Sequence, residues 1–187
     1  RELRPRLEEA QVVVPKDWPR FPDLGVLASI QPARLAPGLP GASSRRSQIE
    51  RLLGSRRAGG VFAWRRVAPE LGVLAFGSDA PAGSANPLHG IFAARRQTSD
   101  DAASDRSLTA GGLSGVDALA GYTSGPAFAA HQEGFRGRLL PGYDADFTVL
   151  DIDPVRVPLA ELLEARVLQV FVGGRAVWSA DKSGKVK

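Results

Sequence analysis

The sequence predicts an α/β protein in which a parallel sheet covered by helices precedes a smaller antiparallel β module. Residues 26–32 and 72–81 are short runs that are apolar on both faces, a pattern typical of strands in a parallel sheet. Helical segments alternate with these strands along the chain, which favours the same arrangement. After Gly134 the sequence becomes β-rich, so we place a boundary between residues 1–134 and 135–187.

The first part should contain three strands. The β-branched run AQVVV at residues 10–14 is closed by Pro15 and predicts the first. Residues 26–32, which stop at Pro32, predict the second, and the stretch GVLAFGSDAP at residues 72–81 predicts the third.

Helices are expected between and after these strands. Residues 46–58 place apolar side chains at helical spacing, and residues 86–97 begin with an Asn cap followed by proline. Residues 114–133 predict two short helices, the first capped by Ser114. Residues 98–107 are polar and predict a loop.

The second part predicts antiparallel strands. The stretches GRLLPGYDADFTVLDIDP and ARVLQVFVGGRAVW are β-rich. Gly173 and Gly174 stand between two apolar runs, as a two-residue hairpin turn requires.

Composition bounds the function. The 187 residues are 43% hydrophobic and 24% charged, which is typical of a globular domain, and the absence of cysteine excludes disulfides and thiolate metal sites. The net charge of +4 comes from scattered arginines without interleaved aromatic residues, so we expect no nucleic-acid partner. No apolar run of about 18 residues and no signal-peptide pattern is visible, so we expect no membrane span and a cytoplasmic location.

The residue most suited to chemistry is Asp79. It ends the third predicted strand, and reactive groups lie at the carboxyl ends of strands in a parallel barrel. A carboxylate there can bind a metal or accept a proton, but its spacing alone favours an ordinary turn residue. Glu9, beside Glu8, is by default a solvated side chain, and the only histidines, His89 and His131, are far apart in sequence.

Seven motifs in a fixed order nevertheless resemble the C-terminal part of amidohydrolase family 3 enzymes, in the metal-dependent amidohydrolase superfamily. The similarity runs from about residue 1 to residue 178. The motifs are RPRLEEAQ, LGVLASIQP, LGVLAFGSDAP, PLHGIFAA, ALAGYTSGPAFA, GRLLPGYDADFTVLDIDP and ARVLQVFVGGRAVW.

The resemblance implies a fold. Family members are (β/α)8 TIM-like barrels with a small composite β-sandwich. Residues 1–134 would then supply the last strands and closing helices of the barrel, and residues 135–187 a segment of the sandwich. The chain also contains no methionine, so we expect either a piece of a longer reading frame or the trimmed product of a precursor.

The resemblance also implies a site. Asp79 matches the final family aspartate, which binds metal, helps to activate the attacking water and shuttles the proton to the leaving nitrogen. Glu9 stands where the family motif RLEHAQ has histidine and could ligate a hard cation, whereas Arg34 stands where members often carry histidine and would repel a dication.

Three interpretations follow. The first is a hydrolase of non-peptide carbon–nitrogen bonds whose full-length parent acts on a small amide-like substrate with a divalent metal, for which we expect zinc. This chain would be an incomplete portion of that parent, and both inactivity and the lack of a metal in this portion are open. Its substrate contacts are predicted at Gln31, Ser78 and His89. The second is a non-catalytic amidohydrolase-like scaffold or dimerising module, for which a homo-oligomer is open. The third, a basic nucleic-acid binder, rests on net charge alone.

Overall fold

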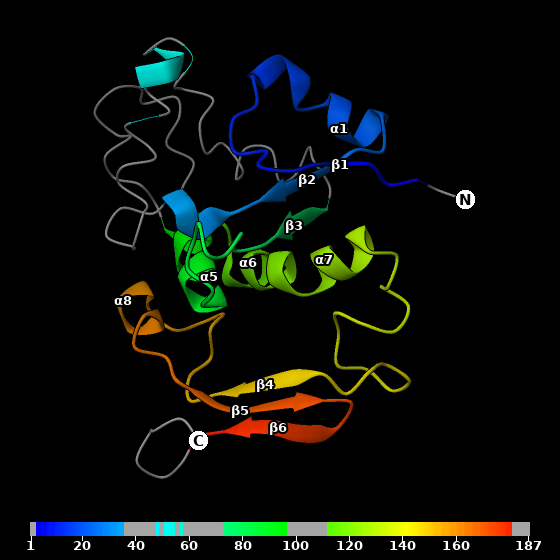
Figure 1. Ribbon diagram of the computed structural model, residues 1–187, viewed down its shortest axis with the longest axis vertical. Coiled ribbons are helices and arrows are strands. Elements are labelled where there is room, and N and C mark those ends of the chain that lie inside the picture. Colours follow the sequence, from blue (N-terminus) through cyan, green and yellow to red (C-terminus); the bar gives the residue numbers. More distant parts are fainter. Residues whose placement is uncertain are drawn as a thin grey trace.

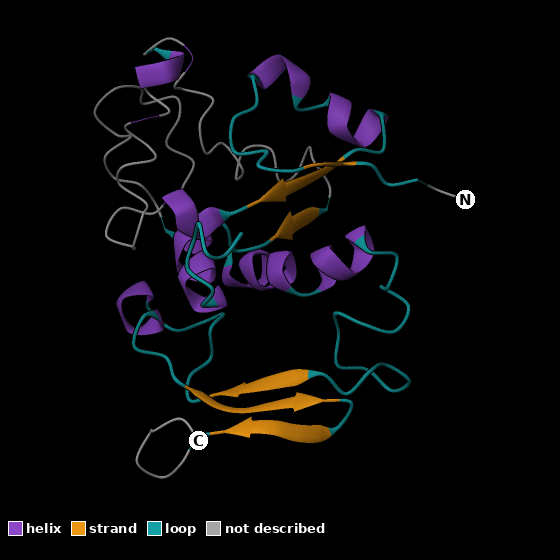
Figure 2. Ribbon diagram, in the orientation of Figure 1, coloured by secondary structure: helices purple, strands orange, loops and turns teal. Residues whose placement is uncertain are grey.

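The computed structural model describes residues 3–35, 73–96 and 112–180, together with 48, 51–54 and 57. Two three-stranded sheets organise this part of the chain, one parallel and one antiparallel, as the sequence predicts. Figures 1 and 2 show the parallel sheet with its helices at one end of the molecule and the antiparallel sheet at the other. The α/β class is thereby confirmed.

The parallel sheet has the order β1–β2–β3. Strand β2 (Leu27–Ile30) is central, and its four residues are all buried. Strand β1 (Arg6–Leu7) pairs with the first two residues of β2, and β3 (Leu74–Phe76) pairs with the last three. Since all three strands run the same way, their carboxyl ends lie at one edge of the sheet.

The strand predicted at residues 10–14 is wrong. The first strand is instead Arg6–Leu7, and residues 8–11 form a turn in which Glu9 has a left-handed φ of 54°. The chain then leads into the 3-10 helix η1 (Pro15–Asp17), and the Val13 carbonyl accepts a hydrogen bond from Trp18 Nε1. The Ala10 amide donates to the Ser29 carbonyl of β2 at 3.0 Å, but Val12 forms only an isolated bridge and residues 13 and 14 belong to no strand.

Short helices precede and follow β2 along the chain. Helix α1 (Arg20–Asp23) lies beside β1 and β2, and the 3-10 helix η2 (Pro32–Leu35) follows β2 directly. Helix α5 (Pro87–Arg95) packs against η2 and begins where predicted, with the Asn86 side chain accepting from the Leu88 amide. The capping residue and the proline after it explain this sharp start.

Two short helices, α6 (Gly115–Tyr122) and α7 (Ser124–Ala129), pack against β3, as predicted for residues 114–133. The Ser114 side chain caps α6 by accepting a hydrogen bond from the Asp117 amide. Close packing of α7 depends on Gly125, since a Cβ there would lie 2.0 Å from the Leu74 carbonyl oxygen.

The antiparallel sheet contains β4 (Phe147–Leu150), β5 (Val167–Val172) and β6 (Arg175–Ser179) in that order. The predicted hairpin is confirmed: Gly173 and Gly174 join β5 to β6 with φ of 55° and 74°. Positive φ at both positions is what this turn demands and what glycine permits. The stacked rings of Phe147 and Phe171, 4.4 Å apart, join β4 to β5.

Helix α8 (Leu159–Leu162) connects the two parts of the structure. Its Leu162 is fully buried in the main apolar cluster, which also contains Ile30 and Phe76 of the parallel sheet. The Arg95 guanidinium at the end of α5 donates to the carbonyls of Pro154 and Val157, both at 2.8 Å. Apolar contacts and hydrogen bonds together hold this connection on the helical layer.

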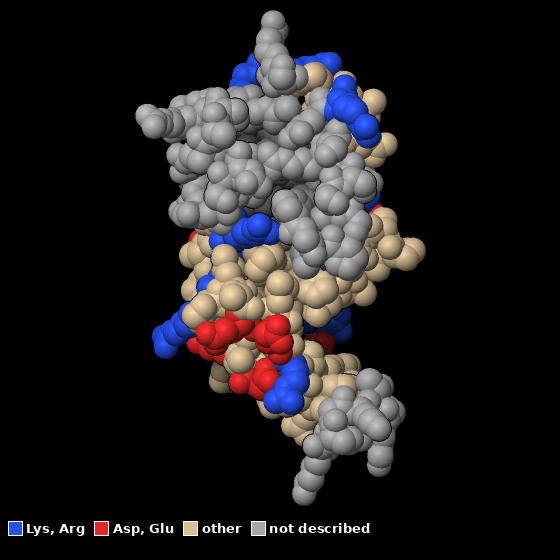
Figure 3. Space-filling model, turned by 90° about the vertical axis from the view of Figure 1, so that its left-hand side faces the viewer, with Lys and Arg blue, Asp and Glu red and all other residues tan. Residues whose placement is uncertain are grey.

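Some expectations fall outside the described residues: most of the helix at 46–58, and the polar stretch at 98–107. Within the described part of the chain, no helix is both long and apolar enough to cross a bilayer. On the face drawn in Figure 3, the coloured basic side chains lie apart from one another, while acidic side chains gather in its lower half.

Replacement of Gly125 by alanine tests the packing of α7 on β3. The added methyl group meets the backbone of Leu74, which cannot turn aside, so we expect a loss of about 2 kcal/mol in the free energy of unfolding. Chemical denaturation measures it. Gly134→Ala is the matched control, since nothing lies within 4 Å of a Cβ there. Equal stabilities of the two variants would contradict this packing.

Asp151 gives a pH-dependent test. Its carboxylate accepts from the Arg166 amide and from Arg166 Nε, and these bonds hold the pKa of Asp151 below its usual value of 3.8. A lowered folded-state pKa stabilises the fold above that value, and the contribution is lost as the pH falls through the folded-state pKa. Asp151→Asn should therefore be less stable than the wild type at pH 7, and the difference should shrink in acid. A stability difference that stays the same in acid would contradict this assignment.

Candidate functional site

The carboxyl edge of the parallel sheet brings three polar side chains together from three loops. Glu9 lies in the turn after β1, Arg34 lies on η2 after β2, and Asp79 follows β3. Arg34 Nη1 donates to Asp79 Oδ2 at 2.6 Å and to a Glu9 carboxylate oxygen. One guanidinium nitrogen thus joins two carboxylates whose positions differ by 70 residues.

Burial separates the three side chains. The Arg34 side chain is 3% exposed, whereas those of Glu9 and Asp79 are 48% and 51% exposed. The cation is therefore inside the protein, and the two anions lie over it at the surface. A buried guanidinium keeps its charge at all ordinary pH values, so its two acceptors are needed to compensate it.

Both carboxylates belong to residues with a left-handed backbone conformation. Glu9 has a φ of 54° and Asp79 a φ of 51°. Aspartate adopts this region readily, whereas glutamate rarely does, so the backbone strain lies at Glu9. Such strain persists only where surrounding contacts maintain it, and it concentrates at functional sites. The bond between Glu9 and Arg34 is one such contact.

The other predicted site residues lie near this edge without joining the cluster. Gln31 directly follows β2 and is buried, and its Oε1 has no hydrogen-bond partner among the described residues. His89 lies in the first turns of α5, and its Nδ1 is likewise buried without a partner there. The Ser78 hydroxyl accepts from the Ala80 amide at 3.3 Å and so shapes the loop after β3.

The residues present do not fit a divalent metal. A zinc site needs three or four converging ligands, and the described residues contain no group of three or more His, Asp or Glu side chains that could hold one. The two predicted ligands, Glu9 and Asp79, already face a cation. Sequence reasoning identified Arg34 as a departure from the family pattern but missed that it binds both carboxylates, because its contacts are distant in sequence.

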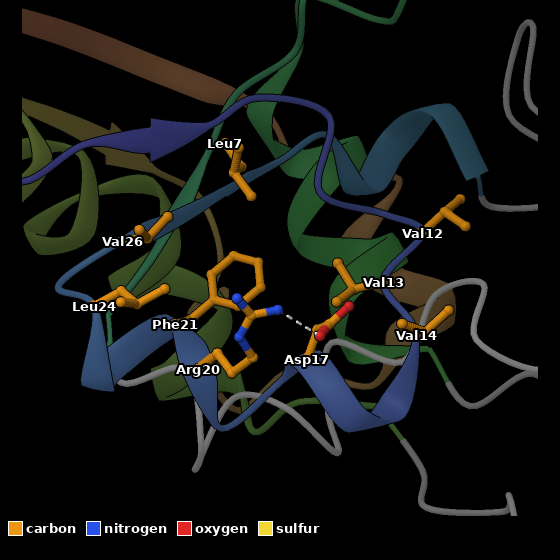
Figure 4. Close-up of a pocket in the computed structure, with 9 residues that line it drawn as sticks. All are labelled: Leu7, Val12, Val13, Val14, Asp17, Arg20, Phe21, Leu24 and Val26. Atoms are coloured by element: carbon orange, nitrogen blue, oxygen red, sulfur yellow. Dashed lines mark hydrogen bonds and ion pairs between the residues drawn. The ribbon is translucent and has the colours of Figure 1, made fainter.

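A separate groove of about 420 Å³ lies between β1 and α1, away from this cluster. Figure 4 shows Leu7, Phe21 and Val26 facing one another within it, with the Asp17–Arg20 ion pair at one side. Its lining contains none of the predicted site residues. Seven of its nine lining residues are apolar, and its two charged residues, Asp17 and Arg20, are paired with each other, so the groove offers shape but little chemistry.

A double-mutant cycle tests the ion-pair cluster. Asp79→Asn and Arg34→Leu each break the pair, so their effects on the free energy of unfolding should be non-additive by about 1–2 kcal/mol. The exposed Asp17–Arg20 pair is the matched control and should couple by less than about 0.5 kcal/mol. Additive effects at Asp79 and Arg34 would show that the contact contributes nothing to stability.

Comparisons with known proteins identify relatives. The family model described as "Amidohydrolase family" matches residues 1–178. The chain is 31% identical to putative amidohydrolase YtcJ of Bacillus subtilis (strain 168) over 174 residues, and 33% identical to protein LONG AFTER FAR-RED 3 of Arabidopsis thaliana over 184 residues. These alignments cover 92% and 95% of this chain but only 32% and 29% of the relatives, so the chain spans about a third of their length.

Solved structures show the same relationship. An uncharacterized metal-dependent hydrolase from Pyrococcus horikoshii OT3 superposes with a TM-score of 0.65 at 28% identity. The superposition covers 83% of this chain and 30% of that one. Since the family model matches nearly the whole sequence, the chain belongs to the amidohydrolase family.

Proposed function

We propose that this chain is the C-terminal portion of a hydrolase that cleaves non-peptide carbon–nitrogen bonds in small amide-like molecules. Residues 1–134 would supply the last strands and closing helices of a (β/α)8 barrel, and residues 135–187 part of a composite β-sandwich. The family match, the parallel sheet with its helices and the following antiparallel sheet support this proposal.

The position of Asp79 carries the proposal. Its carboxylate stands beyond the carboxyl end of β3, where barrel enzymes place reacting groups, and half of its side chain is open to solvent. We assign it the transfer of a proton. A water oxygen attacks the substrate carbonyl carbon, Asp79 accepts the proton from that water, and the proton passes to the nitrogen as the carbon–nitrogen bond breaks.

Substrate contacts are proposed at Gln31, Ser78 and His89. Gln31 Oε1 and His89 Nδ1 are buried polar atoms without a hydrogen-bond partner in the described structure, and so is Arg34 Nε. Buried polar atoms are nearly always satisfied, so each of these has capacity for a bond to a ligand. An amide presents both a donor and an acceptor to such groups.

The test is hydrolysis of a panel of linear and cyclic amides, followed by release of amine or ammonia. Asp79→Asn should lower kcat by about 100-fold or more, because proton transfer contributes 10²–10⁴-fold. Asp144→Asn, which removes another arginine-paired carboxylate, is the control and should keep full activity. Unchanged kcat in a folded Asp79→Asn variant would overturn the role assigned to Asp79, and a folded wild-type chain that hydrolyses no member of the panel would overturn hydrolysis by this chain alone.

One observation favours a second candidate function, a non-catalytic scaffold or dimerising module. Arg34 contacts both carboxylates of the site, and a carboxylate held by a buried cation is stabilised in its place. Light scattering coupled to size-exclusion chromatography discriminates the two. A stable dimer without hydrolysis supports the module, whereas turnover that depends on Asp79 excludes it.

A further inference from the structure

We propose that the Arg34 guanidinium takes the place of a divalent cation at the Glu9–Asp79 pair, so that this site binds no metal ion while Arg34 is present. This inference concerns the same site as the proposed function, and it rests on that function only for the choice of this site. It also departs from the family expectation, under which both carboxylates are metal ligands. Its test reads metal binding and not hydrolysis.

Arg34 occupies the space that a shared metal ion would need. Zinc lies about 2.0–2.2 Å from a carboxylate oxygen that binds it. The oxygens of Glu9 and Asp79 that face each other across the site are both in contact with Arg34 Nη1, at 2.6 Å for Asp79 Oδ2. A cation shared by these two oxygens would have to occupy the volume that Nη1 fills.

The positive charge of Arg34 also opposes the binding of a metal ion. Two carboxylates attract a dication because their negative charge is uncompensated, and here one guanidinium already cancels half of it. Arg34 cannot lose its proton to make way, in contrast to histidine or lysine. A dication that approached the exposed faces of Glu9 and Asp79 would therefore meet a fixed positive charge directly beneath them.

The Arg34 side chain is also held in place by its packing. Its side chain is 3% exposed, and its aliphatic stem lies against the loop after β3. A Cβ at Gly83 would lie 3.0 Å from Arg34 Cγ and 2.5 Å from the Ser78 carbonyl oxygen, so that loop has no free space beside the stem. Helix α5 also packs against η2, the element that carries Arg34. These contacts around the buried stem oppose displacement of the arginine.

The experiment is equilibrium dialysis of the 187-residue chain against Zn²⁺ and, separately, Mn²⁺, followed by elemental analysis. The wild type should bind neither ion stoichiometrically. Arg34→Gln removes the charge and keeps a polar side chain, so its affinity for the divalent ion should rise at least tenfold. Arg34→Lys keeps a cation that can lose its proton to a competing metal ion, so its affinity should lie between those of the wild type and Arg34→Gln. Arg136→Gln, which removes the ion pair of the exposed Asp144, is the control for any loss of an arginine.

Two outcomes overturn the inference. The first is stoichiometric Zn²⁺ or Mn²⁺ in the wild type that is lost in the Glu9→Gln, Asp79→Asn double variant. The second is a folded Arg34→Gln variant, checked by circular dichroism, whose metal affinity equals that of the wild type. If Arg34→Gln does not fold, the wild-type measurement alone decides. Either outcome leaves amide hydrolysis to be judged by its own assay, so the two proposals can fail separately.

Discussion

The ion-pair cluster of Arg34 with Glu9 and Asp79 is the constraint on which the functional edge of this protein depends. The cation is buried and the anions are half exposed, so the three loops after β1, β2 and β3 must converge for the charge of Arg34 to be compensated. Both anions have left-handed backbone conformations, and the surrounding contacts must maintain the one at Glu9. The cluster thus couples the geometry of three strand ends to one side chain.

The rest of the fold supports that edge. The buried strand β2 is the central strand of the parallel sheet, and the 3-10 helix η2 that follows it carries Arg34. Helices α5, α6 and α7 pack against η2 and β3, and small residues such as Gly121 and Gly125 allow that approach, since a Cβ at either would collide with β3. Through α8 and the hydrogen bonds of Arg95, the antiparallel sheet is joined to the same helical layer.

Most of the correct fold predictions came from patterns among residues that are close together in the sequence. The apolar runs of β2 and β3, the Asn86 cap of α5 and the glycine pair of the hairpin each depend on a few neighbouring residues, and each appears in the structure. The prediction misplaced the first strand because β1 consists of only two exposed residues. Their backbone pairing with β2 leaves no apolar pattern in the sequence. The role of Arg34 was missed for a related reason, since its partners lie 25 and 45 residues away. The residue types of the site were predictable; the contact that joins them required the three-dimensional arrangement.

The chain therefore combines the framework of an amidohydrolase with a charge arrangement that departs from a metal centre. The most direct test is a crystal structure of the protein grown in Zn²⁺, with diffraction data collected at the zinc absorption edge. The account predicts Arg34 in contact with both Glu9 and Asp79, and no anomalous peak between the two carboxylates. An anomalous peak bound by both carboxylates, with the Arg34 guanidinium displaced, would contradict it.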